Sequence, residues 1–253
     1  MAGSKRVKGA KANKINSLFI FMLIFGILLI LLAFILKLLY KMNNIVYFSN
    51  ILGLVIIYIG LIGWLGINKN LSLSWNYIKE SRRYIYFAVF LFLLLILIGY
   101  FKPVYFTDYI KSFIEQILKQ TEGLNTFQLI IFILRNNIQN AFLGFILGIA
   151  LGIFPLFNLL LNGYVIGYVS SFAVMEKGYS SLLRLFPHGL FELPALILSL
   201  SLGLKLGLFF LGKNKKQEFM RRLEQGLRVF VFIIIPLLII AGIIEGIFIG
   251  LAG

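Results

Sequence analysis

Cysteine is absent from the 253-residue sequence, and histidine occurs once, at position 188. Without cysteine there is no disulfide framework, no thiolate nucleophile and no cysteine-ligated zinc site. A single histidine likewise excludes a multi-histidine metal site within one subunit. Charged residues make up only 13% of the chain, about half the share in soluble domains, whereas 60% of the residues are hydrophobic. The composition therefore predicts a polytopic membrane protein.

Acidic residues are also scarce, and the only aspartate is Asp108. An aspartic dyad needs two aspartates, so that chemistry is excluded. His188 and Glu192 offer a metal two ligands at most. Ser170 or Ser171 could meet His188, but no nucleophile-elbow spacing surrounds either serine. We therefore expect a protein that is not an enzyme and that holds no metal and no cofactor.

The net charge of +15 is carried by short flanks between apolar runs, which fits membrane orientation better than nucleic-acid binding. The first apolar run, 15–40, is too long for a signal-peptide core and follows five Lys or Arg residues. We interpret it as an uncleaved signal anchor with a cytoplasmic N-terminus. Alternating crossings then put fifteen basic loop residues inside, in the tail and in 68–83 and 212–228, against six outside. This predicts a multi-pass protein of the inner or plasma membrane.

Apolar segments of about 20 residues can cross the hydrocarbon core as helices. Such segments, some of them irregular in length, fall at about residues 17–40, 45–67, 84–101, 127–161, 163–175, 189–211 and 229–251. The sequence therefore predicts an all-α, polytopic transmembrane helical bundle with about six or seven spans, some of them broken or re-entrant. Between the third and fourth segments, residues 102–126 are amphipathic and are expected to form an external helix at the membrane interface.

Composition also divides the chain into four regions. They are a basic cytoplasmic tail (1–14), N-terminal membrane helices with the amphipathic external loop (15–125), a membrane core rich in glycine and amides (126–212), and a basic cytoplasmic loop with the final membrane helix (213–253).

Two middle segments have irregular lengths. Residues 127–134 are cut short by the polar run Arg135-Asn136-Asn137, and 163–175 is too short to cross the bilayer. Broken or re-entrant helices have such lengths, and short interrupted segments are typical of transporter sites. Kinked helices packed by their neighbours explain the same lengths. Whether 163–187 crosses the membrane or re-enters it stays open at this point.

Small residues recur at intervals of four in two places, which puts each set on one helix face. The sets are Asn140, Gly144, Gly148 and Gly152, and Gly242, Gly246 and Gly250. Small residues at this spacing let helix backbones approach closely in lipid. The two sets are expected to join their helices to each other or to form a homodimer interface.

His188 and Glu192 are four residues apart and so share a helix face. Pro187 before them and Pro194 after Glu192 are expected to fix where this helix begins and bends. A histidine beside a carboxylate is a plausible proton acceptor near neutral pH.

The predicted topology puts four ionisable residues at similar depth in the outer half of the bilayer, namely Arg135, His188, Glu192 and Glu245. Each alone costs on the order of 3 kcal/mol in lipid, so mutual pairing is expected. Asn136, Asn137 and Asn162 are expected to satisfy broken backbone ends nearby. The cluster is interpreted either as a buried network that fixes the bundle or as a proton- or ligand-binding site lining an outward cavity.

The small and polar residues between 126 and 212 also follow an ordered pattern. Its pieces are Asn137, Ala141 and Phe145 with Gly148 and Gly152; Asn162 and Gly163 with Gly167; Pro187, His188 and Gly189 with Glu192 and Pro194; and Gly203, Leu204, Lys205, Leu206 and Gly207. In this order they resemble the stage II sporulation protein M family of integral membrane proteins, with H-G-x-x-E-x-P the most specific part.

The founding members of that family anchor a complex with two cell-wall-degrading partners during endospore engulfment. The resemblance implies a membrane-embedded organiser of a complex, with no catalytic role attached to the motif residues. We therefore expect a non-enzymatic scaffold with membrane or envelope protein partners, in contact with the lipid bilayer and not with nucleic acid. The alternative is a transporter, channel or lipid translocator that uses the His188–Glu192 site.

Overall fold

The computed structural model describes residues 67–105 and 107–252, together with single positions at 25, 53, 56, 58 and 60. The chain divides into two compact units, residues 1–72 and residues 73–253. The predicted tail 1–14 lies outside the described residues, as do the predicted spans 17–40 and 45–67 apart from those positions and residue 67. Nearly all of the described residues therefore belong to the second unit.

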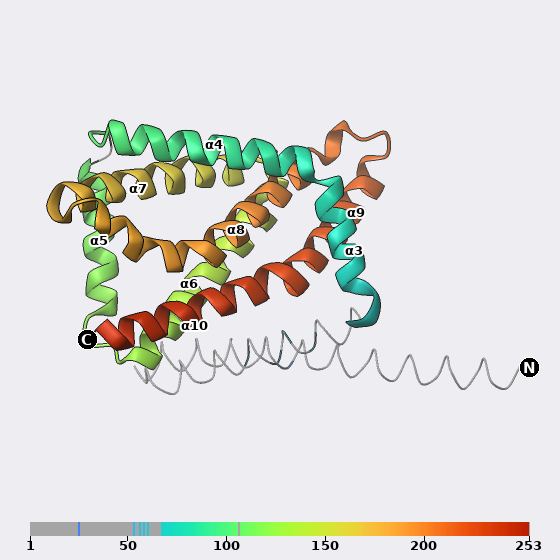
Figure 1. The fold of residues 1–253 in the computed structure, drawn as a ribbon. Helices are drawn as coiled ribbons and strands as arrows, with labels where there is room; N and C mark the ends of the chain where they lie inside the picture. The colour runs from blue at the N-terminus through green and yellow to red at the C-terminus, as the bar shows by residue number, and fades with distance from the viewer. Residues whose placement is uncertain are drawn as a thin grey trace, which may run out of the picture. The chain divides into compact units, whose positions relative to one another are not determined.

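The described residues form helices and short turns, with no strand among them, which confirms the all-α class (Figure 1). Among the described residues, five stretches are long and apolar enough to cross a membrane. They are α4 (Arg82–Phe101), α6 (Thr126–Ile146) with the 3-10 turn Leu147–Ile149, α7 (Ile153–Lys177), the segment Gly189–Gly207 of α8 (Leu182–Gly207), and the stretch Lys215–Glu245. That last stretch joins α9 (Lys215–Val229), a π-helical turn (Phe230–Ile234) and α10 (Ile235–Ala252). A polytopic transmembrane bundle is therefore confirmed.

Two shorter helices flank the spans, α3 (Ile67–Glu80) and α5 (Thr107–Thr121). The amphipathic segment 102–126 thus contains a helix, as predicted; its side of the membrane stays a prediction. α5 packs through Ile110 against Tyr164 and Tyr168 of α7. The Tyr164 hydroxyl accepts a hydrogen bond from the Tyr105 backbone N–H at 2.9 Å and donates one to the Lys102 carbonyl at 2.8 Å, which ties the α4–α5 connection to α7.

The spans pack in two groups that share α8. α4 lies along α7, whereas α6, α8 and α10 contact one another, and α8 also contacts α4 and α7 (Figure 1). One end of this bundle carries the start of α4, the end of α8 and α9. The other end carries α5 and the connection between α7 and α8 (Figure 1). The chain thus reverses direction at each connection between spans.

The hairpin between the two middle spans lies at Leu151–Gly152 and not near residue 162, so the predicted boundary was wrong. Leu151 and Gly152 both adopt left-handed backbone conformations, with φ of 56° and 74°. α6 runs through Arg135-Asn136-Asn137 without a break, because polar side chains lower hydropathy without removing backbone hydrogen bonds. α7 is one helix of 25 residues, so 163–175 is its interior and not a short re-entrant segment.

α8 begins at Leu182, so the prediction that Pro187 marks its start was also wrong. Ser181 precedes the first helical residue, and the short turn Tyr179–Ser181 joins it to α7. Pro187 and Pro194 both lie inside the helix. Proline removes one backbone donor but leaves the rest of a long helix intact when neighbouring helices hold it.

Glycines set the contact between α4 and α7. A Cβ at Gly99 would overlap the carbonyl oxygen of Tyr164, and one at Gly167 would overlap that of Ile96. A Cβ at Gly163 would lie 2.9 Å from the carbonyl oxygen of Phe92. The two helices therefore run side by side with their backbones in contact, and Gly163 serves this approach and not a turn.

The first predicted glycine set packs against α8 and not against the last span, which corrects its expected partner. A Cβ at Gly148 would overlap the carbonyl oxygen of Gly203, and one at Gly207 would overlap backbone atoms of Gly148 and Gly152. Gly152 lies in the hairpin, beyond the end of α6. Of the second set, Gly242 faces Leu134 of α6 at ordinary van der Waals distance. Gly246 and Gly250 lie in α10, and the structure does not describe what they contact.

Candidate functional site

The structure spreads the predicted polar cluster over three neighbouring helices. Arg135 is exposed on α6, and Glu192 and Glu245 are half-buried on α8 and α10. His188 and Glu192 are both in α8, four residues apart, as predicted; the His188 side chain lies outside the described features. Pairing within this group stays a prediction.

The predicted asparagines divide into two sets. Asn136 is exposed and Asn137 half-buried on α6, and neither side chain hydrogen-bonds within the part of the chain that the structure describes. Asn162 instead donates at 2.7 Å to the side-chain oxygen of Asn158, whose amide donates at 2.9 Å to Asn140. This amide ladder joins α6 to α7 side chain to side chain. It bridges two helices, where the sequence predicted caps for broken backbone ends.

A buried lysine at the end of α8 forms a site that the sequence prediction missed. Lys205 is only 3% exposed, and its ammonium donates to Glu80 at 2.8 Å and to the Ser81 hydroxyl at 3.0 Å. The same ammonium lies 3.8 Å from the ring centre of Tyr77, within cation–π range. Burial raises the pKa of the Tyr77 hydroxyl, so the ring stays neutral beside the charge.

α9 joins this site from the other side. Arg221 donates to both carboxylate oxygens of Glu80, at 3.0 and 3.1 Å. Arg222 donates at 2.6 Å to the backbone carbonyl of Lys205 near the end of α8, which also accepts from the backbone N–H of Leu208 at 3.3 Å. Glu218 accepts from both arginines, at 3.2 and 3.0 Å. We call Glu80, Ser81, Lys205, Glu218, Arg221 and Arg222 the lysine network.

Glu80 is the centre of this network. Its partial burial alone would raise the pKa of the carboxyl group, but hydrogen bonds from Lys205 and Arg221 outweigh the burial and hold that pKa below its ordinary value. The carboxylate therefore stays charged at neutral pH. It joins the corner between α3 and α4 to the end of α8 and to α9 at one point.

The lysine network is a set of paired charges that holds helices together. Every charged group in it has a partner of opposite sign at hydrogen-bonding distance. Among the described residues, no group of three His, Cys, Asp or Glu side chains lies close enough to hold a metal ion. One sequence signal did point here, since Lys205 is the only charge between residues 193 and 211 and lies in the quoted Gly203–Gly207 motif.

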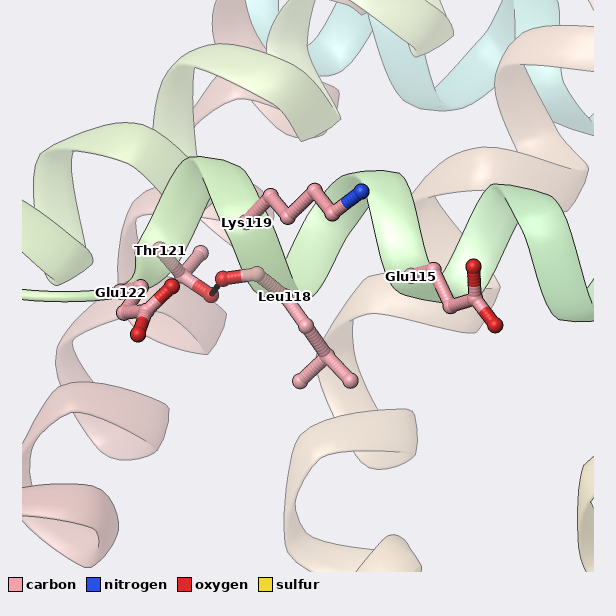
Figure 2. Close-up of a pocket in the computed structure, with 5 residues that line it drawn as sticks. All are labelled: Glu115, Leu118, Lys119, Thr121 and Glu122. Carbon is pink, nitrogen blue, oxygen red and sulfur yellow. Dashed lines mark hydrogen bonds between the residues drawn. The ribbon is translucent and has the colours of Figure 1, made fainter.

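The surface also carries two depressions. The first, of about 450 Å³, is lined by Glu115, Leu118, Lys119, Thr121 and Glu122, all from α5 and the residue after it. Figure 2 shows the Thr121 hydroxyl donating to the Leu118 carbonyl of its own helix, while the charged side chains point in different directions. A notch along one helix brings no groups together from different elements, so we assign it no function.

The second depression is an apolar groove of about 580 Å³ between α4, α7 and α8. Ile85 and Val89 line one wall, and Ser170 supplies a hydroxyl. Gly189 and Pro194 of the H-G-x-x-E-x-P motif line the wall formed by α8.

Comparison with known proteins places the chain in a family. The family model for stage II sporulation protein M matches residues 88–248, a wider range than the 126–212 indicated by the sequence motifs. An uncharacterised protein of Methanocaldococcus jannaschii, MJ0706, is 34% identical over 168 residues, which cover 62% of this chain and 73% of the relative. No solved structure matches the chain. The family match covers more than half of the chain, including both glycine contacts and the lysine network from Lys205 to Arg222, and the protein therefore belongs to the stage II sporulation protein M family.

Proposed function

We propose that this protein is a non-enzymatic membrane scaffold that organises a complex of membrane or envelope proteins. The observation that carries the proposal is the continuity of α7, one helix of 25 residues. Transport sites typically use discontinuous helices near the middle of the bilayer, and the short segments 127–134 and 163–175 were a sequence sign of such helices. Because α6 and α7 run through these segments without a break, that sign of transport is removed.

Rigidity supports the same function. The α4–α7 and α6–α8 pairs touch backbone to backbone at their glycines. The lysine network then ties α3, α8 and α9 together at one end. A frame with such contacts has few ways to rearrange, because packed interiors resist continuous deformation. A scaffold benefits from this property, whereas alternating access requires one group of helices to rock against another.

The proposal includes an orientation in the inner or plasma membrane, with the N-terminus in the cytoplasm. The end of the bundle that holds the lysine network is strongly basic, with Lys79, Arg82, Arg83, Lys213, Lys215, Lys216 and Arg228 beside it in sequence. The other end carries Lys102, Lys111, Lys119, Lys177 and Arg184. Basic residues favour the cytoplasmic side, so the lysine network faces the cytoplasm and α5 faces outward.

Single cysteines test this orientation cleanly, because the chain has no cysteine of its own. We expect Ser112→Cys, exposed on α5, to react with a membrane-impermeant maleimide in intact cells. The matched variant Gln217→Cys, exposed on α9, should react only after the membrane is permeabilised. The reverse pattern would show that the bundle is inverted.

Co-purification from native membranes in mild detergent tests the scaffold itself. We expect partner proteins in fixed stoichiometry, identified by mass spectrometry. A matched preparation of Ser170→Phe, which fills the apolar groove between α4, α7 and α8, should retain the same partners.

The second candidate function, a transporter, channel or lipid translocator, is favoured by that groove, because two residues of the family motif line it. The same experiment separates the two functions. A preparation without protein partners that carries one specific lipid or small molecule, lost in Ser170→Phe, would overturn the scaffold in favour of transport.

A further inference from the structure

One face of α6 is polar near the middle of a membrane span, and none of the helices α3 to α10 packs over it. The inward face of this helix carries Leu134, Ile138, Ala141 and Phe145, which pack in the core with α8 and α10. Asn136, Gln139, Leu143 and Leu147 follow at spacings of three and four on the opposite side, and all four are exposed. We call these four residues the outer face of α6.

The polar residues of this face lie deep in the bilayer. Asn136 comes about ten residues into α6, or roughly 15 Å at 1.5 Å per residue, which is half the thickness of the hydrocarbon core. Within the described chain, no side-chain hydrogen bond engages Asn136 or Gln139, and Arg135 beside them makes no ion pair. Amides and a guanidinium left in hydrocarbon are costly, so such groups face protein or water. Another protein surface with polar groups at the same depth would satisfy them.

A second copy of this chain has the matching chemistry. Two copies inserted in the same orientation are related by a two-fold axis along the membrane normal, so each residue meets its own counterpart at the same depth. A side-chain amide carries both donors and an acceptor and is therefore complementary to itself. Asn and Gln hydrogen bonds between helices are an established means of association in membranes. We propose that the outer face of α6 is the interface of a homodimer, in which Asn136 and Gln139 pair with the same residues of the second copy.

Arg135 fits this arrangement. It lies at the edge of the outer face, about 100° around the helix from Asn136. The two guanidinium groups of a dimer therefore lie apart, and each presents its N–H donors to the amide oxygens of the other chain. Leu143 and Leu147 extend the same face with apolar contacts below the amides.

The first glycine set predicted for a homodimer already packs inside the bundle. Gly144 and Gly148 are occupied by Leu200 and Gly203 of α8. The outer face of α6 lies on the other side of the helix, so dimerisation through it leaves the internal packing intact. The dimer is independent of the scaffold proposal, because it is a contact between copies of the chain and not with the partner proteins.

Disulfide trapping in native membranes tests the dimer. We expect Asn136→Cys and Gln139→Cys, each as the only cysteine, to give a cross-linked species of twice the chain mass on mild oxidation, since Cα atoms must approach within about 7 Å. The matched control is Phe90→Cys, at an exposed apolar position near the middle of α4, which should give no such species. Equal cross-linking of the control, or none at positions 136 and 139, would overturn the proposal.

A second measurement follows self-association by energy transfer during dilution of labelled protein into lipid vesicles. The double variant Asn136→Leu, Gln139→Leu should associate about tenfold more weakly than the parent, as expected for the loss of a few interhelical hydrogen bonds. Its monomer should melt like the parent because both positions are exposed. Unchanged association would overturn the dimer. In the disulfide experiment, a cross-linked species of any other mass would also overturn it and would assign the face to a different protein. Protection of both cysteines from a lipid-soluble maleimide without cross-linking would overturn it as well, and would assign the face to another part of the same chain.

Discussion

Glu80→Gln is expected to lower the free energy of unfolding by about 3 kcal/mol, measured by denaturant titration in detergent micelles. The substitution removes the carboxylate that neutralises Lys205, whose side chain is only 4% exposed. Leaving a buried charge without its partner costs about 3–5 kcal/mol. We place the effect at the lower end, because the Glu80 side chain is 46% exposed and the Ser81 hydroxyl still accepts from the ammonium.

A double-mutant cycle separates pairing from simple loss of a residue. Lys205→Met keeps the length of the side chain and removes the charge, so Glu80→Gln in that background should cost far less than in the parent. Replacing both members of a buried ion pair is often close to neutral. If the losses in free energy of unfolding from the two single changes were additive in the double variant, the ion pair between Glu80 and Lys205 would contribute nothing to stability.

The same pair predicts the direction of the pH dependence. The pKa of Glu80 is lower in the folded protein than in the unfolded chain, so the folded state binds the carboxyl proton less tightly. This contribution to stability is fully present above the unfolded pKa and disappears as the pH falls through the folded value. The parent should therefore lose stability in acid more steeply than Glu80→Gln. If the free energy of unfolding of the two proteins fell equally with decreasing pH, the pairing of Glu80 with Lys205 and Arg221 would be contradicted.

The hydropathy pattern predicted several helices of the fold correctly. The segments 84–101 and 229–251 were predicted as spans, and both lie mainly within helices of the structure, α4 and α10. The amphipathic segment 102–126 was predicted as a helix and contains α5. These elements were accessible because a membrane span is a local property of composition and length.

The position of the α6–α7 hairpin could not be predicted from hydropathy. The run Arg135-Asn136-Asn137 lowers hydropathy inside a helix, while the real turn at Leu151 and Gly152 lies within an apolar stretch. Asn162-Gly163 has the composition of a turn, yet Gly163 is needed where α7 touches α4. A backbone approach and a turn both call for glycine, and the sequence alone does not separate them.

The residues of the candidate site were harder to predict, because the sequence does not show which distant side chains meet in the fold. Lys205 was visible as a lone charge in an apolar run, but Glu80 precedes it by 125 residues. Without a fold, nothing in the sequence connects them. The predicted cluster of Arg135, His188, Glu192 and Glu245 rested on equal depth, and depth alone does not decide which side chains meet. The amide ladder likewise needed Asn158 from α7, which no periodicity within α6 could supply.

Gly203→Ala is expected to destabilise the protein by about 3 kcal/mol, although it adds a single methyl group. The new Cβ would overlap the carbonyl oxygen of Gly144 and would lie 3.2 Å from the Cα of Phe145, so both contacts are with backbone. Overpacking in a close-packed interior costs about 1–3 kcal/mol, and we take the upper value because neither helix backbone can rotate away as a side chain would. α6 and α8 would have to separate, and unfolding in detergent would measure the cost.

Gly242→Ala is the matched control, because it adds the same methyl group to another membrane helix. There the new Cβ meets Leu134 at 3.5 Å, an ordinary contact. Alanine exceeds glycine in helix propensity by about 1 kcal/mol, so this variant should be as stable as the parent or more stable. If Gly203→Ala behaved like Gly242→Ala, the backbone contact between α6 and α8 would be looser than the structure has it. If both variants lost stability equally, the effect would come from glycine replacement in general and not from the close approach of two backbones.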